Sequence, residues 1–528
     1  MTSNYQLLIK NILHTPVAYN PEQEIVYRDK RFTYAQFHAR INRLANALTA
    51  MGIKKGDTVA VMDYDSNRYL EAYFAVPMIG AILHTINIRL SPEQMLYTIE
   101  HAEDDVILVH EDFLPLLDQI KGRISGVREY IVLRDDATCE YEKMLEIQSD
   151  QFTYEEFDEN TVATTFYTTG TTGMPKGVYF THRQLVLHTL GGIASLSTTK
   201  EQGRFHRDDV YMPITPMFHV HAWGIPYVAT MLGVKQVYPG KYVPDVLIDL
   251  LEREKVTFSH CVPTILHMLL LSPRIEEVDL SNWKVVIGGS ALPKSLCIAA
   301  LERGIDVYTG YGMSETCPLL SLAHLETDQL DLSLEEQAEI RIKTGKPVGL
   351  VDLRLVDEAM QEVPSDGEHV GEIVARGPWL TEGYLKDKKN SRKLWEGGYL
   401  HTGDIATRDP DGYFKITDRA KDIIKVGGEW VSSLELEDIL GQHDGVSEVA
   451  VIGAAHERWG EVPLGLVVLK EGSTATQKDI ELFARDYIKK GIMARESMLL
   501  KIKIVDQIDK TSVGKVNKKA LREKHATS

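Results

Sequence analysis

Apolar residues recur at two different spacings along the first two-thirds of the chain. Between Phe37 and Leu48 they lie three or four positions apart, which is the spacing of one helix face. Thr33 and Gln36 precede this segment as a capping box, a usual start of a helix. An apolar run at Thr58–Met62 then has the length of a strand. The alternation returns further along the chain, so it predicts sheets that are covered by helices. Further elements predicted in this way are a helix that opens at Ser91-Pro92, strands at Asp105–His110, Val256–Cys261 and Lys284–Ile287, and a helix at Pro244–Glu254.

The pattern changes after about Lys346. Short strand signals there alternate with Gly, Pro and Asp turns, which predicts a small antiparallel sheet or barrel. From about residue 420 a second α/β pattern begins, and we place a boundary at 418–422. The elements predicted in these two parts are strands at Val351–Val356, Gly371–Arg376, Gly412–Lys415, Ser447–Gly453 and Leu464–Leu469, and a helix at Gln477–Lys490.

The composition narrows the class of protein. Of the 528 residues, 44% are apolar and 25% charged, as in soluble globular proteins. The formal net charge of −18 disfavours a nucleic-acid partner. No run approaches ~18 apolar residues, so no transmembrane segment is predicted. The segment Met1–Leu13 lacks the features of a signal peptide, and the scattered cysteines form no Cys-x-x-Cys pair. We therefore expect a cytoplasmic protein with reduced thiols.

The most informative segment is 167–177, Tyr-Thr-Thr-Gly-Thr-Thr-Gly-Met-Pro-Lys-Gly. Its glycines let the backbone approach a ligand closely, and its hydroxyl and N–H groups can surround phosphate oxygens. It is not a Walker A loop, because Pro175 stands where that motif needs glycine. We predict a phosphate-binding loop here, and the alternative is a flexible surface turn. The candidate ATP-binding residues of the loop are Thr168, Thr169, Gly170, Thr171, Thr172, Gly173 and Lys176.

This loop resembles the signature of the adenylate-forming superfamily, which comprises acyl-CoA synthetases, luciferases and peptide-synthetase adenylation domains. Five further motifs follow in the family's order, and the resemblance covers about residues 20 to 522. They are Gly288-Gly289-Ser290-Ala291, the segment 308–316 (Tyr-Thr-Gly-Tyr-Gly-Met-Ser-Glu-Thr), the segment 399–404 (Tyr-Leu-His-Thr-Gly-Asp), the segment 418–430 (Asp-Arg-Ala-Lys-Asp-Ile-Ile-Lys-Val-Gly-Gly-Glu-Trp), and Val513-Gly514-Lys515.

The resemblance implies an α/β fold in three parts. Residues 1–417 would form a large N-terminal domain of two helix-flanked sheets plus a small β-barrel-like subdomain. Residues 418–422 would be a hinge, with Lys421 at the family's pivot position. Residues 423–528 would form a small mobile α+β C-terminal domain.

The resemblance also implies a two-step reaction with ATP, Mg²⁺ and coenzyme A. A carboxylate attacks the α-phosphate of ATP, and a thiol then attacks the acyl-adenylate. Glu315 would bind Mg²⁺ with Thr168 as hydroxyl partner, Asp404 would accept the ribose hydroxyls, and Lys515 and Lys425 would be catalytic. The remaining nucleotide-binding residues would be Gly289, Ser290, Thr309, Gly310, Tyr311, Gly312, Ser314, Arg419 and Lys421.

The segment 216–224, Pro-Met-Phe-His-Val-His-Ala-Trp-Gly, resembles the acyl-pocket motif of fatty acyl-CoA synthetases, in which the tryptophan gates an apolar tunnel. The acyl-binding residues would be His219, Val220 and Trp223. His221 stands where most relatives have Asn, which puts the chain length of the acid in doubt. Gly427, Gly428 and Trp430 would lie on the coenzyme A side, where glycines leave room for a pantetheine arm.

We therefore predict an AMP-forming fatty acid–CoA ligase, with a medium- or long-chain acid favoured. The same chemistry on a short, branched, sulfur-containing or aromatic acid is the near alternative. An adenylation domain, a luciferase and a nucleotide-binding protein without catalysis remain further alternatives. The expected partners are small molecules (fatty acid, ATP and CoA), and a homodimer is kept open.

Overall fold

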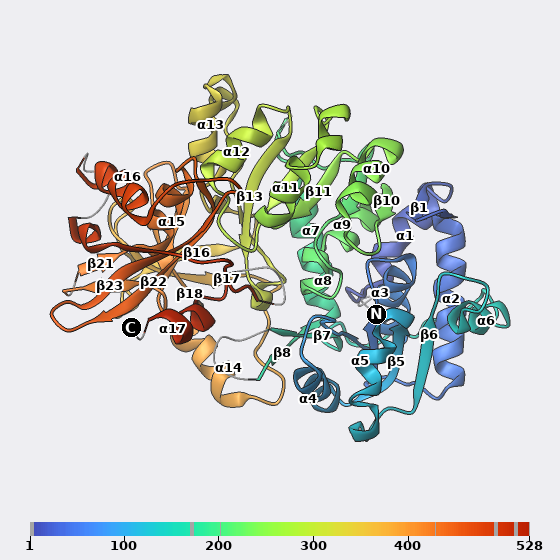
Figure 1. The fold of residues 1–528 in the computed structure, drawn as a ribbon. Coiled ribbons are helices and arrows are strands. Elements are labelled where there is room, and N and C mark those ends of the chain that lie inside the picture. Colours follow the sequence, from blue (N-terminus) through green and yellow to red (C-terminus); the bar gives the residue numbers. More distant parts are fainter. Residues whose placement is uncertain are drawn as a thin grey trace.

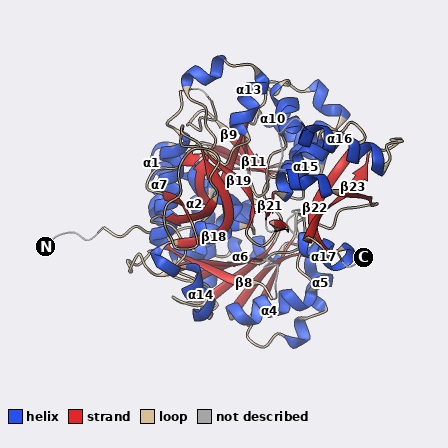
Figure 2. Ribbon diagram, turned by 90° about the vertical axis from the view of Figure 1, so that its left-hand side faces the viewer, coloured by secondary structure: helices blue, strands red, loops and turns tan. Residues whose placement is uncertain are grey.

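The structure is a computed structural model that describes residues 5–168, 174–200, 202–427, 429–489, 495–511 and 516–526 (Figure 1). Thr169–Gly173, Gly428 and Lys515 therefore lie outside the described residues, as does the side chain of Trp430. The described chain forms four sheets, and helices cover them (Figure 2).

The largest sheet has nine strands, and its six central strands are parallel. Strand β2 at one edge and strands β14 and β15 at the other edge are antiparallel to their neighbours. In spatial order the strands are β15 (Lys346–Pro347), β14 (Leu319–Leu322), β13 (Asp306–Gly312), β12 (Lys284–Ile287), β11 (Phe258–Cys261), β9 (Val210–Pro213), β10 (Lys235–Tyr238), β1 (Glu24–Tyr27) and β2 (Lys30–Thr33).

The second sheet has six strands, which are parallel except for the last one. Strands β7 and β8 run antiparallel and flank the glycine-rich loop, so Thr168 and Lys176 are register partners at its two ends. In spatial order the strands are β6 (Glu129–Leu133), β5 (Asp104–His110), β3 (Thr58–Met62), β4 (Ile82–Thr85), β7 (Val162–Thr168) and β8 (Lys176–Thr181).

Both sheets are apolar on their two faces because helices cover each face. In β3, Val59 and Val61 join the core between the two sheets, whereas Ala60 and Met62 join an outer core. The helices of the shared core are α1 (Lys10–Tyr19), α2 (Tyr34–Ala50), α3 (Asn67–Met78), α6 (Glu140–Glu146), α7 (His182–Leu196) and α9 (Ile225–Leu232). The outer helices are α4 (Pro92–Ala102) and α5 (Leu114–Asp118) on the six-stranded sheet, and α10 (Pro244–Glu254), α11 (Pro263–Leu270), α12 (Lys294–Leu301) and α13 (Leu334–Arg341) on the nine-stranded sheet.

A four-stranded antiparallel sheet follows, which is one of the two forms predicted for this part. Its strands are β16 (Asp352–Val356), β17 (Gly371–Arg376), β18 (Leu400–Arg408) and β19 (Phe414–Arg419), and helix α14 (Lys388–Leu394) lies between β17 and β18 in the chain. The last sheet contains β20 (Ile424–Val426), β21 (Glu429–Val431), β22 (Val446–His456), β23 (Gly460–Leu469) and β24 (Lys501–Ile504), with helices α15 (Ser433–Gly441), α16 (Gln477–Lys489) and α17 (Lys518–His525).

The short helical turns are η1 (Glu111–Phe113), η2 (Lys121–Arg123), η3 (Pro273–Glu277), η4 (Ser314–Thr316), η5 (Thr327–Asp331), η6 (Glu396–Gly398), η7 (Arg495–Leu499) and the atypical α8 (Val220–Trp223). Among the described residues, no helix combines the length and apolar composition that crossing a bilayer requires. The four cysteines, Cys139, Cys261, Cys297 and Cys317, are buried free thiols.

Several predicted strand bounds were wrong. Strand β23 begins at Gly460 rather than Leu464, and β22 ends at His456 rather than Gly453, so both extend further into the hairpin that joins them. Two other strands begin two residues later than predicted, and local turns explain both. The strand predicted at Gly412–Lys415 is β19 and begins at Phe414, because the Gly412 N–H donates to the Asp409 carbonyl in a turn (3.0 Å). Gly412 has φ +87° there, a conformation natural to glycine. The strand predicted from Val256 begins at Phe258, because the Val256 N–H still caps helix α10 through the carbonyl of Leu251.

Candidate active site

The ends of β12 and β13 bring two of the predicted motifs together. In an open parallel sheet, ligands bind beyond the carboxyl ends of such strands. A Cβ on Gly288 would lie 2.7 Å from the carbonyl oxygen of Gly310, and one on Gly312 would lie 1.6 Å from that of Pro318. These glycines are therefore required by the close approach of neighbouring backbones. Gly289 and the exposed Ser290 continue from this edge, and the buried hydroxyl of Thr309 has no hydrogen-bond partner among the described residues.

Asp404 is the centre of a polar cluster at this edge. It is 4% exposed; the hydroxyl of Tyr311 donates to its Oδ2 (2.7 Å), and Arg419 Nε lies 3.0 Å from its Oδ1. Asp404 and Arg419 are register partners on β18 and β19, so the sheet itself sets this ion pair. Burial and the Asp404 charge raise the pKa of Tyr311, which stays a neutral donor. Each carboxylate oxygen still has a lone pair for a diol hydroxyl.

Lys421 lies two residues beyond this cluster. Partial removal of the ammonium from water and the neighbouring charge of Arg419 lower the pKa of Lys421. The charges of Asp422 and Asp404 act in the opposite direction. The charges of Arg419 and Asp404 therefore act on the ammonium of the predicted pivot residue. Asp422, the next residue, pairs with Arg522 of helix α17 (2.6 Å).

Glu315 lies in turn η4, and its side chain is buried. Its Oε1 accepts a hydrogen bond from the hydroxyl of Tyr384 (2.7 Å). Burial raises its pKa, and the charges of Lys176 and Arg419 partly offset that shift. The ammonium of Lys176 lies 4.6 Å from the centre of the Tyr384 ring. The structure thus brings Glu315 next to the end of the glycine-rich loop, while Ser314 is half-buried beside it.

The donors near Glu315 fit a magnesium ion better than a transition metal. No group of three or more His, Cys, Asp or Glu side chains in the described ranges could hold a metal ion. Magnesium needs only one or two carboxylates when phosphates and water supply its other ligands. The buried carboxylate of Glu315 meets that need, with the hydroxyl of Thr168 at the near end of the loop.

Tyr384 was missed by the sequence analysis. It lies 69 residues from Glu315, outside every recognised motif. Its segment is held to the site because the Thr381 N–H donates to the Glu315 carbonyl (2.9 Å). The only sequence signal was a Gly-Tyr pair between two polar turns, which is too common to indicate a site.

Trp223 reaches the same strand ends from an unusual turn. The residues from Val220 to Trp223 have φ values between +47° and +58°, and Gly224 has φ +70°. Such left-handed conformations are rare for residues with a side chain. A Cβ on Gly288 would lie 3.0 Å from Cη2 of Trp223, so the indole covers the glycine edge. Its ring centre is 5.0 Å from that of His260 on β11.

His221 is buried in this turn, and it has φ +54°. Histidine and asparagine both occur more often than most residues in the left-handed region, which explains why either type suits this position. Phe166 lies edge-on to the imidazole with ring centres 5.1 Å apart. Burial lowers the pKa of His221 to about 3, so the ring is neutral. Its predicted neighbours Val220 and His219 are buried and half-buried, respectively.

The predicted coenzyme A side lies in the C-terminal sheet. The Gly427 N–H donates to the carbonyl of Trp459 (2.8 Å), and a Cβ on Gly427 would lie 3.0 Å from the Trp459 ring. Lys425 is exposed and pairs in register with Trp430, and its N–H donates to Glu461 (3.2 Å). These contacts stay within the C-terminal sheet, so they do not join the cluster around Asp404 and Glu315.

Comparisons with known proteins identify the family. The profile of the family described as AMP-binding enzyme matches residues 13–385, and that of the AMP-binding enzyme C-terminal domain matches residues 435–515. The chain belongs to the AMP-binding enzyme family. It is 40% identical over 501 residues to a long-chain-fatty-acid–CoA ligase of Thermus thermophilus, covering 94% of this chain and 90% of the relative.

Two further similar proteins are named for other acids. A 3-methylmercaptopropionyl-CoA ligase of Ruegeria lacuscaerulensis is 36% identical over 541 residues, covering 98% and 97% of the two chains. The crystal structure of the anthranilate CoA ligase AuaEII in complex with anthranoyl-AMP has a TM-score of 0.86 at 25% identity, covering 98% of this chain and 97% of that chain. The predicted family, the α/β fold class and the class of acyl-CoA synthetase are thereby confirmed.

Proposed function

We propose that this enzyme forms an acyl-CoA from a fatty acid, ATP and coenzyme A, with an acyl-adenylate as intermediate and AMP and pyrophosphate as products. One observation carries the proposal. The polar cluster of Asp404, Tyr311 and Arg419 and the apolar side chain of Trp223 converge on the ends of β12 and β13. A polar half for a nucleotide next to an apolar half for an acid is the arrangement that an acyl-adenylate needs.

In the first step the protein positions two negatively charged reactants. Asp404 would hold the ribose, while Lys176 and the glycine-rich loop would hold the phosphates. Glu315 and Thr168 would hold Mg²⁺, which supplies charge neutralisation at the phosphates when bound. Lys515 would place a further cation beside the carboxylate and the α-phosphate.

In the second step a thiol replaces AMP at the acyl carbonyl. The sulfur–carbon bond forms as the thiol gives up its proton to water, the bond between the acyl carbon and the phosphate oxygen breaks, and AMP leaves with the electron pair of that bond. We assign Lys425, Gly427, Gly428 and Trp430 to the coenzyme A side. The division at 418–422 and the rotation of the C-terminal domain between the steps are part of the same proposal.

A medium- or long-chain acid is the favoured substrate, in line with the relative from Thermus thermophilus. A short or sulfur-containing acid is the second candidate, and one observation favours it. The ring centre of His260 lies 5.0 Å from that of Trp223, and His260 Nε2 shares a hydrogen bond with the Tyr211 hydroxyl (2.8 Å). If the acyl chain passes the indole of Trp223, this polar pair would shorten the apolar surface that the chain can contact.

A panel of straight-chain acids from two to eighteen carbons tests the proposal and chooses between the candidates. Each methylene that is buried contributes ~0.8 kcal/mol, or roughly fourfold in kcat/KM, until the pocket ends. Thioester formation that rises along the series to a medium or long acid supports the first candidate, and a break at four or five carbons supports the second. Absence of thioester with every acid would overturn the proposal.

Location and assembly also remain predictions. We expect the protein in the cytoplasm, and size-exclusion chromatography would decide between a monomer and a homodimer.

A further inference from the structure

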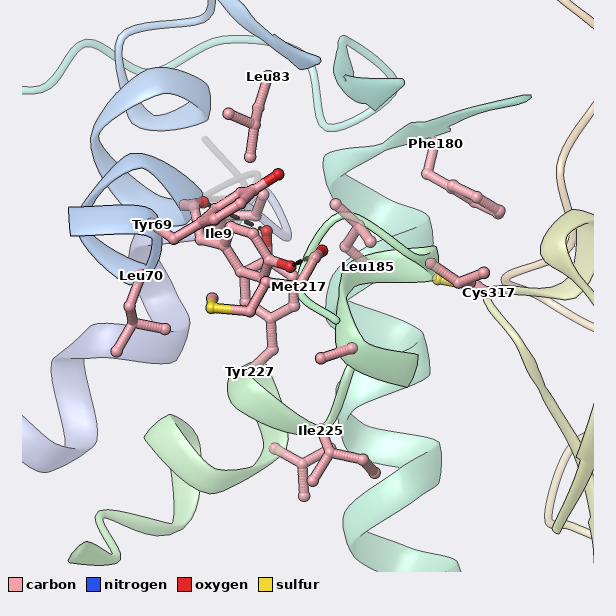
Figure 3. Packing of buried hydrophobic residues seen from close by; sticks show 14 of the residues in the cluster. Ile9, Tyr69, Leu70, Leu83, Phe180, Leu185, Met217, Ile225, Tyr227 and Cys317 are labelled. Atoms are coloured by element: carbon pink, nitrogen blue, oxygen red, sulfur yellow. Dashed lines mark hydrogen bonds between the residues drawn. The ribbon is translucent and has the colours of Figure 1, made fainter. Parts of the chain in front are cut away.

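Three buried side chains hold the backbone just before the left-handed turn at Val220–Gly224. The Met217 N–H donates to Asp65 Oδ1 (2.9 Å), and the hydroxyl of Tyr73 donates to the Met217 carbonyl. The hydroxyl of Thr85 donates to the Phe218 carbonyl (3.0 Å). Figure 3 shows Met217 beside Tyr227 in a cluster of buried hydrophobic residues.

Tyr73 contacts both sides of the turn. Its ring lies edge-on to His221, with ring centres 5.9 Å apart, and stacks on Tyr227 at 5.3 Å. The hydroxyl of Tyr227 in turn donates to the Tyr73 carbonyl (3.2 Å). Tyr73 and Thr85 are both fully buried, so water cannot replace the hydrogen bonds that they donate.

A run of left-handed residues persists only where the surrounding structure enforces it. The turn ends in Trp223, and a small change in its path would move the indole away from Gly288. The two hydroxyls come from helix α3 and strand β4, elements that touch neither Asp404 nor Glu315 in the hydrogen bonds and ion pairs of the described residues.

We propose that Tyr73 and Thr85 are positioning residues for the acid side of the site. Their hydroxyls hold the backbone of Met217 and Phe218, which fixes the left-handed turn and places Trp223 over Gly288. The inference rests on the proposed function, because the acid side is defined there. It assigns a role in acid recognition to two residues outside every motif that the sequence analysis recognised.

The test removes one side-chain hydroxyl at a time by substitution. Tyr73→Phe and Thr85→Val keep the shape of the side chain and delete the donor. Thr85→Ser restores the donor and should restore wild-type behaviour. The matched controls are Tyr34→Phe and Thr98→Val, because these buried hydroxyls also donate to backbone carbonyls, those of Val234 (2.8 Å) and Met95 (2.9 Å), away from the turn.

Two readouts separate positioning from general stability. In acid-dependent ATP–pyrophosphate exchange, kcat/KM for the acid should fall by at least about tenfold in both variants, while KM for ATP changes less than about twofold. Amide hydrogen exchange over 217–224 should become at least about fivefold faster in these variants and stay unchanged in the controls.

Equal losses toward acid and ATP, or equal losses in the controls, would overturn the inference, as would unchanged hydrogen exchange over 217–224. If the wild-type enzyme uses no acid of the panel, the proposed function fails. The hydrogen-exchange comparison still decides whether the two hydroxyls hold the turn.

Discussion

Glu315 is a buried carboxylate whose observed side-chain hydrogen bond comes from a neutral phenol. Keeping a negative charge in such a place costs free energy unless a cation lies close by. The charges of Lys176 and Arg419 act on it, and Lys176 lies at one end of the loop that the sequence predicts to bind phosphate. We therefore propose that this carboxylate binds a cation.

We predict that Glu315→Gln lowers the rate of adenylation by roughly 10²-fold and weakens the dependence on magnesium. The amide keeps the shape and still accepts the hydrogen bond of Tyr384, so the thermal midpoint should change little. The measurement is pyrophosphate exchange against magnesium concentration. A normal rate with an unchanged titration would remove Glu315 from the metal site.

Asp65 gives a prediction for pH. Burial raises its pKa to about 7, although Tyr242 and the Met217 N–H donate to it; the nearby charges of Asp63 and Arg89 act in opposite directions. Because the folded pKa lies above the unfolded value, the folded state holds the proton more tightly. The stability that Asp65 contributes is present below about pH 4 and is lost as the pH rises to 7.

We therefore predict that Asp65→Asn gains stability relative to the wild-type protein between pH 5 and pH 8, by an amount on the order of 2 kcal/mol. Thermal or urea unfolding of both proteins at the two pH values measures this change. Parallel pH profiles would contradict the assigned pKa.

At the residue scale, the sequence predicts those site residues that lie within short motifs. Glu315, Asp404 and Arg419 are recognised from neighbours in the chain, and the structure brings them together. Tyr384, Tyr73 and Thr85 could not be predicted, because each acts on a partner 69 to 144 residues away. The residues next to them in the sequence do not indicate which distant residue each one contacts.

At the scale of single elements, the left-handed turn at Val220–Gly224 carries a high conformational cost. Four of its residues carry a Cβ, and each left-handed residue costs roughly 1–2 kcal/mol. Helices and strands with clear periodicity, such as α10 and β12, match their predicted bounds. The turn does not follow from any periodicity. Gly224 and His221 are residue types that tolerate positive φ, but they do not by themselves predict a left-handed turn.

Gly224 allows a test of how tightly the turn is packed. A Cβ there would lie 2.5 Å from Cε1 of His188, in addition to the strain of φ +70°. We predict that Gly224→Ala destabilises the protein by at least about 2 kcal/mol. Gly412→Ala is the control, because it has φ +87° with nothing within 4 Å, so it should cost only about 1–2 kcal/mol. Equal losses of thermal stability would show that the turn has room.

At the scale of the whole molecule, the question is how adenylation and thioester formation both take place at the same acyl carbonyl. The cluster around Asp404 belongs to the N-terminal sheets, while Lys425 and Gly427 make their contacts within the C-terminal sheet. The alternation of elements predicts both parts from sequence. Their relative placement does not follow from sequence, because it depends on contacts between distant residues, such as the hydrogen bond that the Ser432 hydroxyl donates to the Thr417 carbonyl.

Lys515 belongs to this scale because it would act across the two parts. We predict that Lys515→Ala lowers acid-dependent pyrophosphate exchange by roughly 10²–10³-fold while largely sparing the conversion of supplied acyl-AMP to thioester. Rapid-quench assays of the two half-reactions measure the ratio. An equal loss in both would make Lys515 structural or shared.

Lys421 tests the rotation. Proline at 421 fixes φ near −65° and removes an N–H, which would restrict a hinge at this position. We predict that Lys421→Pro keeps acyl-AMP formation and lowers thioester formation by at least ~10²-fold. Circular dichroism and the thermal midpoint verify folding. A folded variant that retains both activities would contradict the rotation.

The central claim is that this chain makes an acyl-adenylate, and exchange of labelled pyrophosphate into ATP without coenzyme A tests it most directly. The account predicts that exchange requires a carboxylic acid and magnesium, that it saturates with the acid, and that fatty acids support it best. Exchange that is absent with every acid of the panel, or that proceeds equally without acid, would contradict the account.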